Sequence, residues 1–492
     1  MEKYVINPSY FLKNDKKRVI LGSKEDVDVS EFFSFIHPVN AQFLSFFNGK
    51  DSLRVVMRKI SEHFGISIKD AEEISKKYLQ NSKSFHIRHQ DHCMRFPENI
   101  LVTKDSVEKY DVYSIEDFGL VSDLDFKTER LSFPLYINFN MNMKCFTNCI
   151  YCYANRKMKI GKYLPLNRIL EIIEEAKSNG VLEFEINGGE VFMHSHIKEV
   201  LIALVKNGYS GLVSTKIPIS LDLVLFLKDA GIKTMQISLD SVRISTLKRM
   251  IGVEDDYMEK MKETIEHLNR EKIEIRIHHI LTSYNSDLNE FKEFVSFLSS
   301  YEYVKKIQIS TAGYTLYPPR SDYDYCNIRT SEKYMNTLEE YINSIRDALP
   351  NINFSISAST EKKEFCDENK KEEFGNRTVC TGNLRSIVIL PDGKVTICEE
   401  LYDHPVFIIG DLNEHSIEEV WNSDAAKKLF YLQKEALPND TACKGCSEFD
   451  FCRQDRGVCW KIILMAYGKD KWDYPDPRCP LSPPVYNEIW LA

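Results

Sequence analysis

The sequence has no long hydrophobic run and no excess of positive charge. No stretch approaches the ~20 apolar residues that a membrane-spanning helix needs, and the first residues, MEKYVINPSYFLKNDKK, lack the apolar core of a signal peptide. The net charge of −9 disfavours nucleic acid and acidic membranes as partners, because phosphate binding requires a basic surface. We therefore expect a cytoplasmic protein.

The chain is too long for one hydrophobic core. Its 492 residues, 43% hydrophobic and 28% charged, have the balance of a soluble globular protein and predict two or three domains. Thirteen cysteines are unusual in a reducing compartment, where clustered thiols bind metal more often than they form disulfides. Ten fall into two groups, and only Cys93, Cys326 and Cys366 stand apart.

The pattern along the chain predicts four segments. Residues 1–90 form a small domain with two extended runs and three helices, and residues 91–130 form a polar linker. From 131 to 350, strands alternate with amphipathic helices, which predicts a parallel sheet curled into a full or partial barrel. Residues 351–492 form a short, cysteine-rich and turn-rich domain. The predicted strands of the third segment are Pro134–Phe139, Leu182–Ile186, Gly211–Thr215, Lys233–Leu239, Ile273–Leu281 and Val304–Ser310.

Three cysteines follow the first barrel strand directly. Cys145, Cys149 and Cys152 lie in one short loop, and three thiolates can occupy three corners of an iron–sulfur cube. No fourth cysteine is near, so one iron would stay open to a cofactor or substrate. A structural zinc site is the alternative, although zinc prefers four ligands.

This loop resembles the CxxxCxxC signature of the radical S-adenosylmethionine (SAM) superfamily, and Tyr151 before the last cysteine fits it as well. The resemblance implies a partial (β/α)6 barrel of the α/β class. It also implies a [4Fe–4S] cluster that binds SAM through its open iron. An external electron donor of the flavodoxin or ferredoxin type would start the cleavage of SAM to a 5′-deoxyadenosyl radical.

Further residues match the SAM-binding motifs of this family. Asn187, Gly188, Gly189 and Glu190 follow the second strand and match the GGE motif, which holds the SAM amino group; the glycines would let the backbone approach a ligand. The fourth strand ends in Ser238-Leu-Asp240-Ser, which resembles S-L-D-G, and Arg249 follows. Ser238 and Arg249 would contact the SAM carboxylate; a strand-end cap and a surface arginine are the alternative.

One segment departs from the family. Where relatives carry T-N-G after the third strand, this chain has Thr215-Lys216-Ile217. SAM contacts from the third strand are therefore not predicted.

The second cysteine group resembles the SPASM domain, the auxiliary-cluster module of peptide-modifying radical SAM enzymes. Six residues separate Cys452 from Cys459, where the usual pattern has three. The resemblance implies two auxiliary [4Fe–4S] clusters. Their ligands would be Cys443, Cys446, Cys452 and Cys479 for one, and Cys380, Cys398 and Cys459 for the other.

The second auxiliary cluster lacks an evident fourth ligand. Cys366, or less favourably Cys326, would complete it; otherwise an open iron could bind a substrate thiolate. Glu399, next to Cys398, stands where sulfatase-maturing relatives carry an aspartate base and is the candidate catalytic residue. An exposed hairpin glutamate is the alternative.

The first domain resembles the winged-helix-like recognition element for precursor peptides that is fused to many such enzymes. A leader peptide would add to it as an extra strand, which raises the local concentration of the core peptide. A helical cap on the barrel is the alternative.

Together the resemblances imply a maturase of a ribosomally synthesised peptide (a RiPP). The preferred product is a cysteine thioether, as in sactipeptide and ranthipeptide enzymes. Carbon–carbon or carbon–oxygen crosslinking, formylglycine formation as in anaerobic sulfatase maturases, and a non-catalytic metal-stabilised binding protein are the alternatives.

Overall fold

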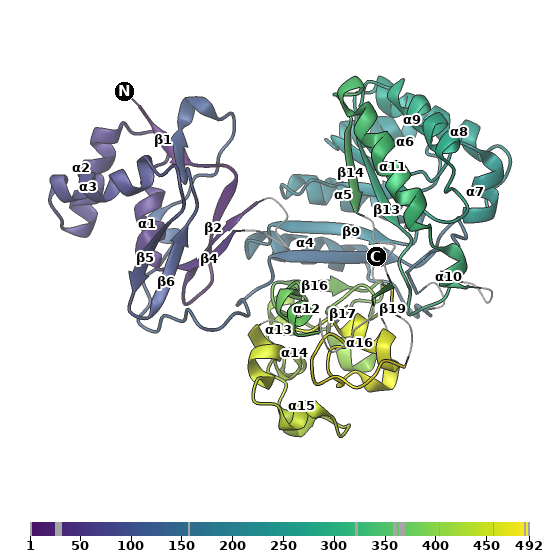
Figure 1. Cartoon of the computed structure of the whole chain (residues 1–492). Coiled ribbons are helices and arrows are strands. Elements are labelled where there is room, and N and C mark those ends of the chain that lie inside the picture. The colour runs from purple at the N-terminus through teal and green to yellow at the C-terminus, as the bar shows by residue number, and fades with distance from the viewer. Residues whose placement is uncertain are drawn as a thin grey trace. The chain divides into compact units, whose positions relative to one another are not determined.

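The computed structural model describes residues 2–24, 32–155, 158–319, 323–357, 362–363, 370–402, 404–455, 457–486 and 489–490. The chain divides into two compact units, Met1–Leu135 and Tyr136–Ala492. Figure 1 labels their helices and strands.

The first unit packs three helices against short strands. Its sheets have the orders β2-β3-β4, β1-β7 and β5-β6. Phe43 and Tyr78 lie in its core, with ring centroids 5.0 Å apart. The elements are β1 (Tyr4–Ile6), β2 (Tyr10–Asn14), β3 (Val19–Ser23), β4 (Phe33–Ile36), α1 (Pro38–Ser45), α2 (Leu53–Phe64), α3 (Ile68–Leu79), β5 (Phe85–His89), β6 (His92–Phe96) and β7 (Leu101–Thr103).

Local sequence explains the helix boundaries here. Helix α2 ends at Gly65, whose φ of 65° is left-handed and suits glycine. Helix α3 begins after Ser67, whose hydroxyl accepts a hydrogen bond from the amide of Asp70 at 3.1 Å. All three predicted helices are present.

The linker predicted over 91–130 differs from the structure. Strand β6 and strand β7 fall inside that range, and Met94 and Phe96 are buried in the core of the first unit. The two strands of hairpin β5–β6 have only five residues each, so their alternation of exposed and buried side chains is short. The polar composition of the segment therefore did not indicate a hairpin. The first unit therefore extends to residue 135.

The second unit begins with seven parallel barrel strands. Strands β8 and β9 pair in one sheet, and strands β10 to β14 pair in order in another. All six predicted strands are present. The strands are β8 (Tyr136–Asn142), β9 (Glu183–Gly188), β10 (Val213–Thr215), β11 (Thr234–Ser238), β12 (Glu274–Leu281), β13 (Val304–Thr311) and β14 (Asn353–Ser357). The short, polar β14 was not predicted, and it carries the barrel past residue 350.

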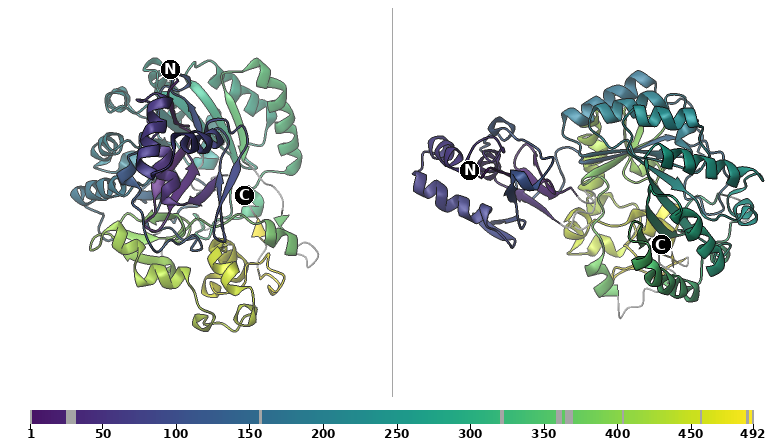
Figure 2. Two further views of the ribbon diagram at one scale, coloured as in Figure 1. Left: turned by 90° about the vertical axis from the view of Figure 1, so that its left-hand side faces the viewer. Right: turned by 90° about the horizontal axis from the view of Figure 1, so that it is seen from above.

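Helices cover the outer face of these strands (Figures 1 and 2). They are α4 (Leu166–Ser178), α5 (Ile197–Lys206), α6 (Leu221–Asp229), α7 (Ile244–Ile251), α8 (Tyr257–Arg270), α9 (Leu288–Ser299) and α11 (Glu332–Ile345). The short α10 (Tyr325–Ile328) lies in the connection between β13 and α11. In β12, Ile275 and Ile277 are buried, whereas Arg276 and His278, which alternate with them, are only half-buried. The inner face is therefore polar, and the expected partial α/β barrel is confirmed.

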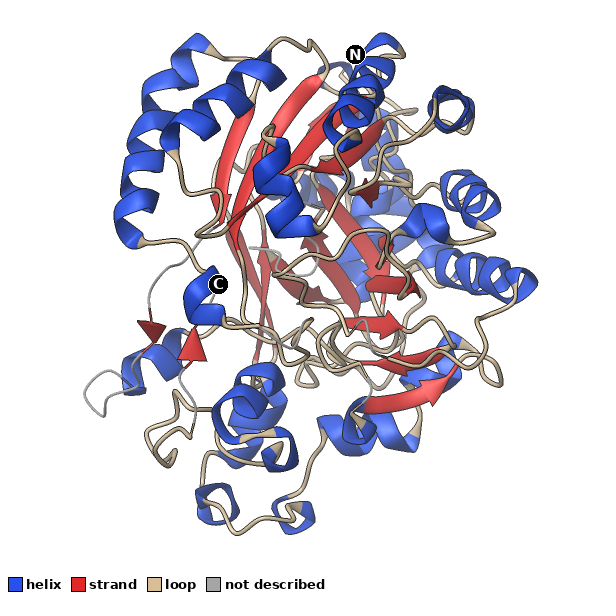
Figure 3. Cartoon of the chain, turned by 90° about the vertical axis from the view of Figure 1, so that its right-hand side faces the viewer, coloured by secondary structure: helices blue, strands red, loops and turns tan. Residues whose placement is uncertain are grey.

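The cysteine-rich region joins the barrel through one sheet (Figure 3). Strand β16 pairs in parallel with β8, which gives the order β18-β17-β16-β8-β9. In the described part of the chain, no helix is long and apolar enough to cross a membrane. The elements are β15 (Lys362–Lys363), α12 (Lys370–Asn376), β16 (Ser386–Ile389), β17 (Lys394–Thr396), β18 (Ile408–Asp411), α13 (Ile417–Trp421), α14 (Asp424–Phe430), α15 (Ala442–Gly445), α16 (Trp460–Tyr467) and β19 (Ile489–Trp490).

Candidate active site

The three-cysteine loop lies just beyond β8, and two of its thiols lie near one threonine hydroxyl. The hydroxyl oxygen of Thr147 lies 3.3 Å from the sulfur of Cys145 and 3.4 Å from that of Cys149. Burial raises the pKa of the Cys149 thiol, and the nearby charge of Lys216 opposes that rise. Closely spaced thiols beside a cation fit the thiolate ligation of an iron–sulfur cluster.

Backbone hydrogen bonds fasten this loop to two neighbouring elements. The amide of Asn148 donates to the carbonyl of Ile251 at the end of α7 at 2.8 Å. The amide of Glu190 donates to the carbonyl of Lys144 at 2.7 Å. The loop is therefore held between the end of helix α7 and the end of strand β9.

Gly188 and Gly189 make this packing possible. A Cβ atom on Gly189 would lie 2.1 Å from the carbonyl oxygen of Lys144, and one on Gly188 would lie 2.3 Å from that of Asn142. Gly188 also has a φ of 131°, which few other residues adopt. We expected the glycines to admit a ligand; in the structure they admit the backbone of the cysteine loop.

Glu190 joins two strand ends. It is 2% exposed, and its carboxylate accepts hydrogen bonds from the Thr215 hydroxyl at 2.9 Å and the Lys216 amide at 3.1 Å. Burial raises its pKa in spite of these bonds. Both carboxylate oxygens therefore already accept hydrogen bonds from the protein. Binding of the SAM amino group by Glu190 remains a prediction.

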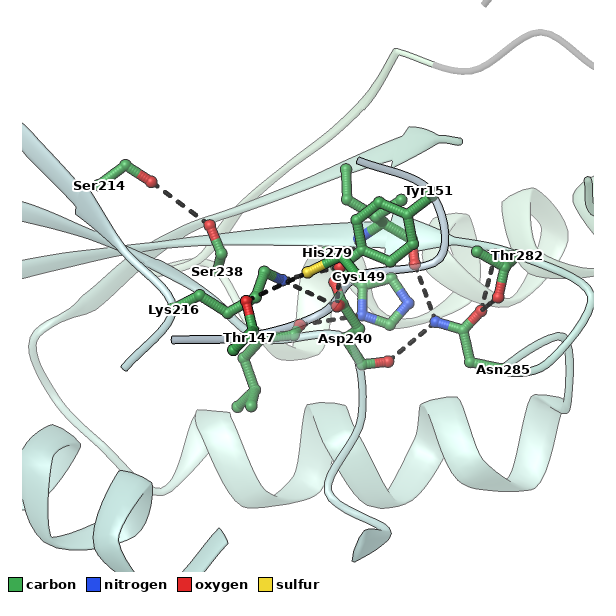
Figure 4. A network of polar contacts seen from close by, with 12 residues as sticks. Thr147, Cys149, Tyr151, Ser214, Lys216, Ser238, Asp240, His279, Thr282 and Asn285 are labelled. Carbon is green, nitrogen blue, oxygen red and sulfur yellow. Dashed lines mark hydrogen bonds and ion pairs between the residues drawn. The ribbon is translucent and has the colours of Figure 1, made fainter. Parts of the chain in front are cut away.

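A buried ion pair lies beside the cysteine loop (Figure 4). The ammonium of Lys216 lies 2.8 Å from Asp240 Oδ2 and 2.9 Å from the hydroxyl oxygen of Tyr151, which itself donates to Asp240. The side chain of Asp240 is fully buried and that of Lys216 is 14% exposed. Asp240 Oδ1 accepts from the amide of Ile280 at 3.0 Å.

The charges in this cluster support one another. Burial is the largest single effect and opposes both charged forms. The attraction between Lys216 and Asp240, together with the cysteine thiols near Lys216 and the Tyr151 hydrogen bond to Asp240, outweighs it, so the pKa of Lys216 is raised and that of Asp240 lowered. The sequence argument did not predict Lys216. The sequence feature that could have indicated this lysine is the departure from T-N-G, because Lys216 stands where that motif has an asparagine.

The other predicted SAM contacts lie at different places. Ser238 stands two residues before Asp240 at the end of the same strand. Its hydroxyl oxygen lies 3.3 Å from the hydroxyl oxygen of Ser214. Arg249 is exposed on α7, and its guanidinium lies 5.5 Å from the ring centroid of Tyr284. The structure therefore brings Tyr151, Ser238 and Asp240 to one strand end, whereas Arg249 lies on the helix that holds the cysteine loop.

The seven remaining predicted ligands separate into two groups. Four of them line a cavity of about 240 Å³; these are Cys443, Cys446, Cys452 and Cys479. Cys398 and Cys459 both experience the charge of Cys380, and burial with that charge raises the pKa of Cys459 to about 11. These neighbours are compatible with the division that the SPASM resemblance implies, and the ligand sets themselves stay a prediction. Cys326 is exposed on α10, and Cys366 lies outside the described residues.

Glu399 reaches the inner face of the barrel. Its Oε2 lies 3.2 Å from the amide nitrogen of Asn187 on β9 and 3.4 Å from that of Asn138 on β8. The Tyr153 hydroxyl lies 3.4 Å from the same oxygen. Burial, with the charge of Glu400, raises the pKa of Glu399. It is half-buried, so the alternative of an exposed hairpin glutamate is wrong.

Comparisons with known proteins match two parts of the second unit. Residues 139–298 match the model of the radical SAM superfamily, and residues 380–447 match that of SPASM, an iron–sulfur cluster-binding domain.

Several curated proteins are similar to the chain. The antilisterial bacteriocin subtilosin biosynthesis protein AlbA of Bacillus subtilis is 25% identical over 331 residues, which are 64% of this chain and 67% of AlbA. A PqqA peptide cyclase of Methylorubrum extorquens is 20% identical over 71% of this chain and 86% of its own. A GTP 3′,8-cyclase of Helicobacter pylori is 30% identical over 22% of this chain and only 35% of its own.

A solved structure has a similar fold. Streptococcus suis SuiB bound to its precursor peptide SuiA has a TM-score of 0.59 and 17% identity, and the match covers 97% of this chain and 98% of SuiB. With the strand-end motifs in place, the chain carries a radical SAM domain over residues 139–298 and a SPASM iron–sulfur cluster-binding domain over residues 380–447.

Proposed function

We propose that this protein is a radical SAM peptide maturase that installs a crosslink, preferably a cysteine thioether, in a ribosomally synthesised precursor peptide. One observation carries the proposal. Because β16 pairs with β8, the hairpin that bears Cys398 and Glu399 continues the barrel sheet and reaches its inner face. A peptide there would meet both the cysteine loop and the auxiliary region. The names of AlbA and of the SuiB–SuiA complex agree with a peptide substrate.

The strand-end cluster would hold the cofactors. Cys145, Cys149 and Cys152 would bind a [4Fe–4S] cluster, which supplies with SAM the radical that removes a hydrogen atom from the peptide. Ser238 and Arg249 would bind the SAM carboxylate, and the Asn187–Glu190 segment its amino group. Lys216, Asp240 and Tyr151 would keep a fixed, water-poor electrostatic environment next to the loop. The electron would come from a flavodoxin or ferredoxin type of donor.

Glu399 would act on the peptide as a general base. Its carboxylate lies beside the side-chain amides of Asn138 and Asn187, whose Oδ1 atoms are buried and lack a hydrogen-bond partner among the described residues. Peptide N–H groups would satisfy such acceptors. Glu399 Oε2 would then accept the proton of a peptide thiol, which must leave when a thioether forms.

The auxiliary region would hold two [4Fe–4S] clusters. Four thiols line the cavity described above and would close one cluster. The group of Cys380, Cys398 and Cys459 would leave an iron for a substrate thiolate, unless Cys366 ligates it. The open iron favours thioether formation over carbon–carbon or carbon–oxygen crosslinking.

The first unit would bind the leader of the precursor. Ile68 and Ile74 on α3 are large apolar side chains that are 51% and 39% exposed, and they offer contacts to an amphipathic peptide. Retention of the precursor by residues 1–135 but not by residues 136–492 would support this role. A cytoplasmic location, which cysteine use favours, is part of the same proposal.

Co-expression with the short peptides encoded beside the gene tests the function. Mass spectrometry should detect the loss of two hydrogen atoms per crosslink, and the crosslinked cysteine should resist alkylation by iodoacetamide. A loss of two hydrogens with an alkylatable cysteine would indicate a carbon–carbon or carbon–oxygen bond. Formylglycine in a leaderless peptide would instead indicate a sulfatase-maturase-like enzyme.

A further inference from the structure

Two buried arginines point at the thiols of the four-cysteine group. Arg453 is 6% exposed, and its Nη2 lies 3.7 Å from the sulfur of Cys443. The same nitrogen donates to the carbonyls of Asp473 and Tyr474 at 3.3 and 3.0 Å. Arg453 also lines the cavity that the four cysteines share.

Arg377 approaches the same group from another segment, just after α12. It is 5% exposed, and its Nη2 lies 3.6 Å from the sulfur of Cys452. Its Nε and Nη2 donate to the carbonyl of Gly457 at 3.2 and 3.1 Å. Backbone carbonyls therefore fix the positions of both guanidinium groups.

The charge of Arg453 needs a negative partner that the described residues do not supply. Among them, no carboxylate forms an ion pair with Arg453, and its buried Nη1 has no hydrogen-bond acceptor. A buried charge without a counter-charge is strongly unfavourable. A thiolate-ligated cluster in the adjoining cavity would provide both the negative charge and the sulfur acceptors.

The three-cysteine group has different surroundings. Glu400 follows Cys398 by two residues and lies near the three-cysteine group, whereas Asp476 lies near Cys459 and also lines the four-cysteine cavity. The cations near them are already paired, Lys461 with Glu400 and Arg478 with Asp476 at 2.7 Å. Both carboxylates are therefore matched by cations, and Arg453 at the four-cysteine group is a buried charge without a carboxylate partner among the described residues.

We propose that Arg377 and Arg453 raise the reduction potential of the cluster held by Cys443, Cys446, Cys452 and Cys479, and make it the more easily reduced of the two auxiliary clusters. Reduction adds one negative charge, which nearby cations and N–H groups directed at the sulfurs stabilise. The inference rests on the proposed function, which supplies the two clusters.

An anaerobic redox titration of the reconstituted holoenzyme, followed by electron paramagnetic resonance, tests this. In Arg453→Met and in Arg377→Met, the signal of this cluster should need a more negative potential. The ratio of reduced to oxidised cluster at a fixed potential should fall about tenfold in each, the size of one charge-assisted hydrogen bond. Arg453→Lys, which keeps the charge, should recover much of the difference.

Lys444→Met is the matched control. Lys444 stands between Cys443 and Cys446 in sequence but is exposed, so water and salt screen its charge. Its removal should leave the potential nearly unchanged. The proposal is overturned if Arg377→Met and Arg453→Met shift the potential no more than Lys444→Met does. If Arg453→Met does not retain the cluster, Arg377→Met decides alone.

Failure of the proposed function would look different. In that case, the variant with Cys443 and Cys446 both replaced by alanine would bind as much iron as the wild type, and the wild type would give no auxiliary signal to titrate.

Discussion

The cysteine loop of the barrel and the four-cysteine group of the SPASM domain both lie beside buried cations, but these cations are balanced differently. Lys216 at the barrel loop forms an ion pair with Asp240, which is fully buried. Arg453 at the four-cysteine group is held by backbone carbonyls and has no carboxylate partner in the described chain. The barrel loop also offers three thiols, the other group four. Under the proposed function, the barrel loop would be an open, cofactor-binding site and the four-cysteine group a closed site that accepts electrons.

The largest effect should separate the two regions functionally. Cys452→Ala removes a ligand of the proposed closed cluster and leaves the barrel loop intact. We expect SAM cleavage to continue, while crosslinked peptide falls to background. Deoxyadenosine and peptide mass, measured on one reaction, check this. Continued crosslinking would show that the four-cysteine group is not needed for the reaction; Cys93→Ala, at an exposed position of the first unit, serves as the control.

Gly189→Ala tests how the barrel loop is held. The added Cβ would collide with the carbonyl of Lys144 and displace the loop, so we expect SAM cleavage to fall about 100-fold, as for a misplacement of ~1 Å. Gly161→Ala, where a Cβ would meet no atom within 4 Å, should match the wild type. Equal activity of the two variants would contradict the packing role of Gly189.

Lys216→Met breaks the balanced pair. It leaves the carboxylate of Asp240 buried without its partner, which costs about 3–5 kcal/mol of unfolding free energy. Lys216→Met combined with Asp240→Asn should recover much of that loss. Thermal unfolding of the three proteins measures it. A single variant as stable as the double variant would contradict the coupling.

The smallest effect concerns a buried lysine whose charge is less well compensated. Lys13 on β2 is 9% exposed, and burial lowers its pKa to about 8 despite the charge of Asp15. Because the folded pKa lies below the unfolded value near 10.5, this lysine destabilises the fold at neutral pH, and the penalty disappears as pH rises from 8 to 10.5. Lys13→Met should therefore stabilise residues 1–135 by up to about 3 kcal/mol at pH 7.

Urea unfolding of residues 1–135 at several pH values checks this. The gain from Lys13→Met should shrink above pH 8. A gain that is constant with pH would show that the charge of Lys13 is not the cause.

Sequence predicted the barrel well because its strands and helices have strong periodicity and its motifs lie at strand ends. It missed β14, whose sequence NFSIS is short and polar. It also missed the parallel pairing of β16 with β8, because a pairing between residues about 250 apart leaves no local signal. The roles of Lys216, Arg377 and Arg453 depend on neighbours that only the fold brings together.

The most direct measurement is the amount of 5′-deoxyadenosine released when the anaerobically reconstituted, reduced protein meets SAM. We predict release by the wild type and none when Cys145, Cys149 and Cys152 are replaced by alanine. Release by the triple variant, or none by iron-loaded wild type, would contradict the assignment of this loop as the site of SAM cleavage.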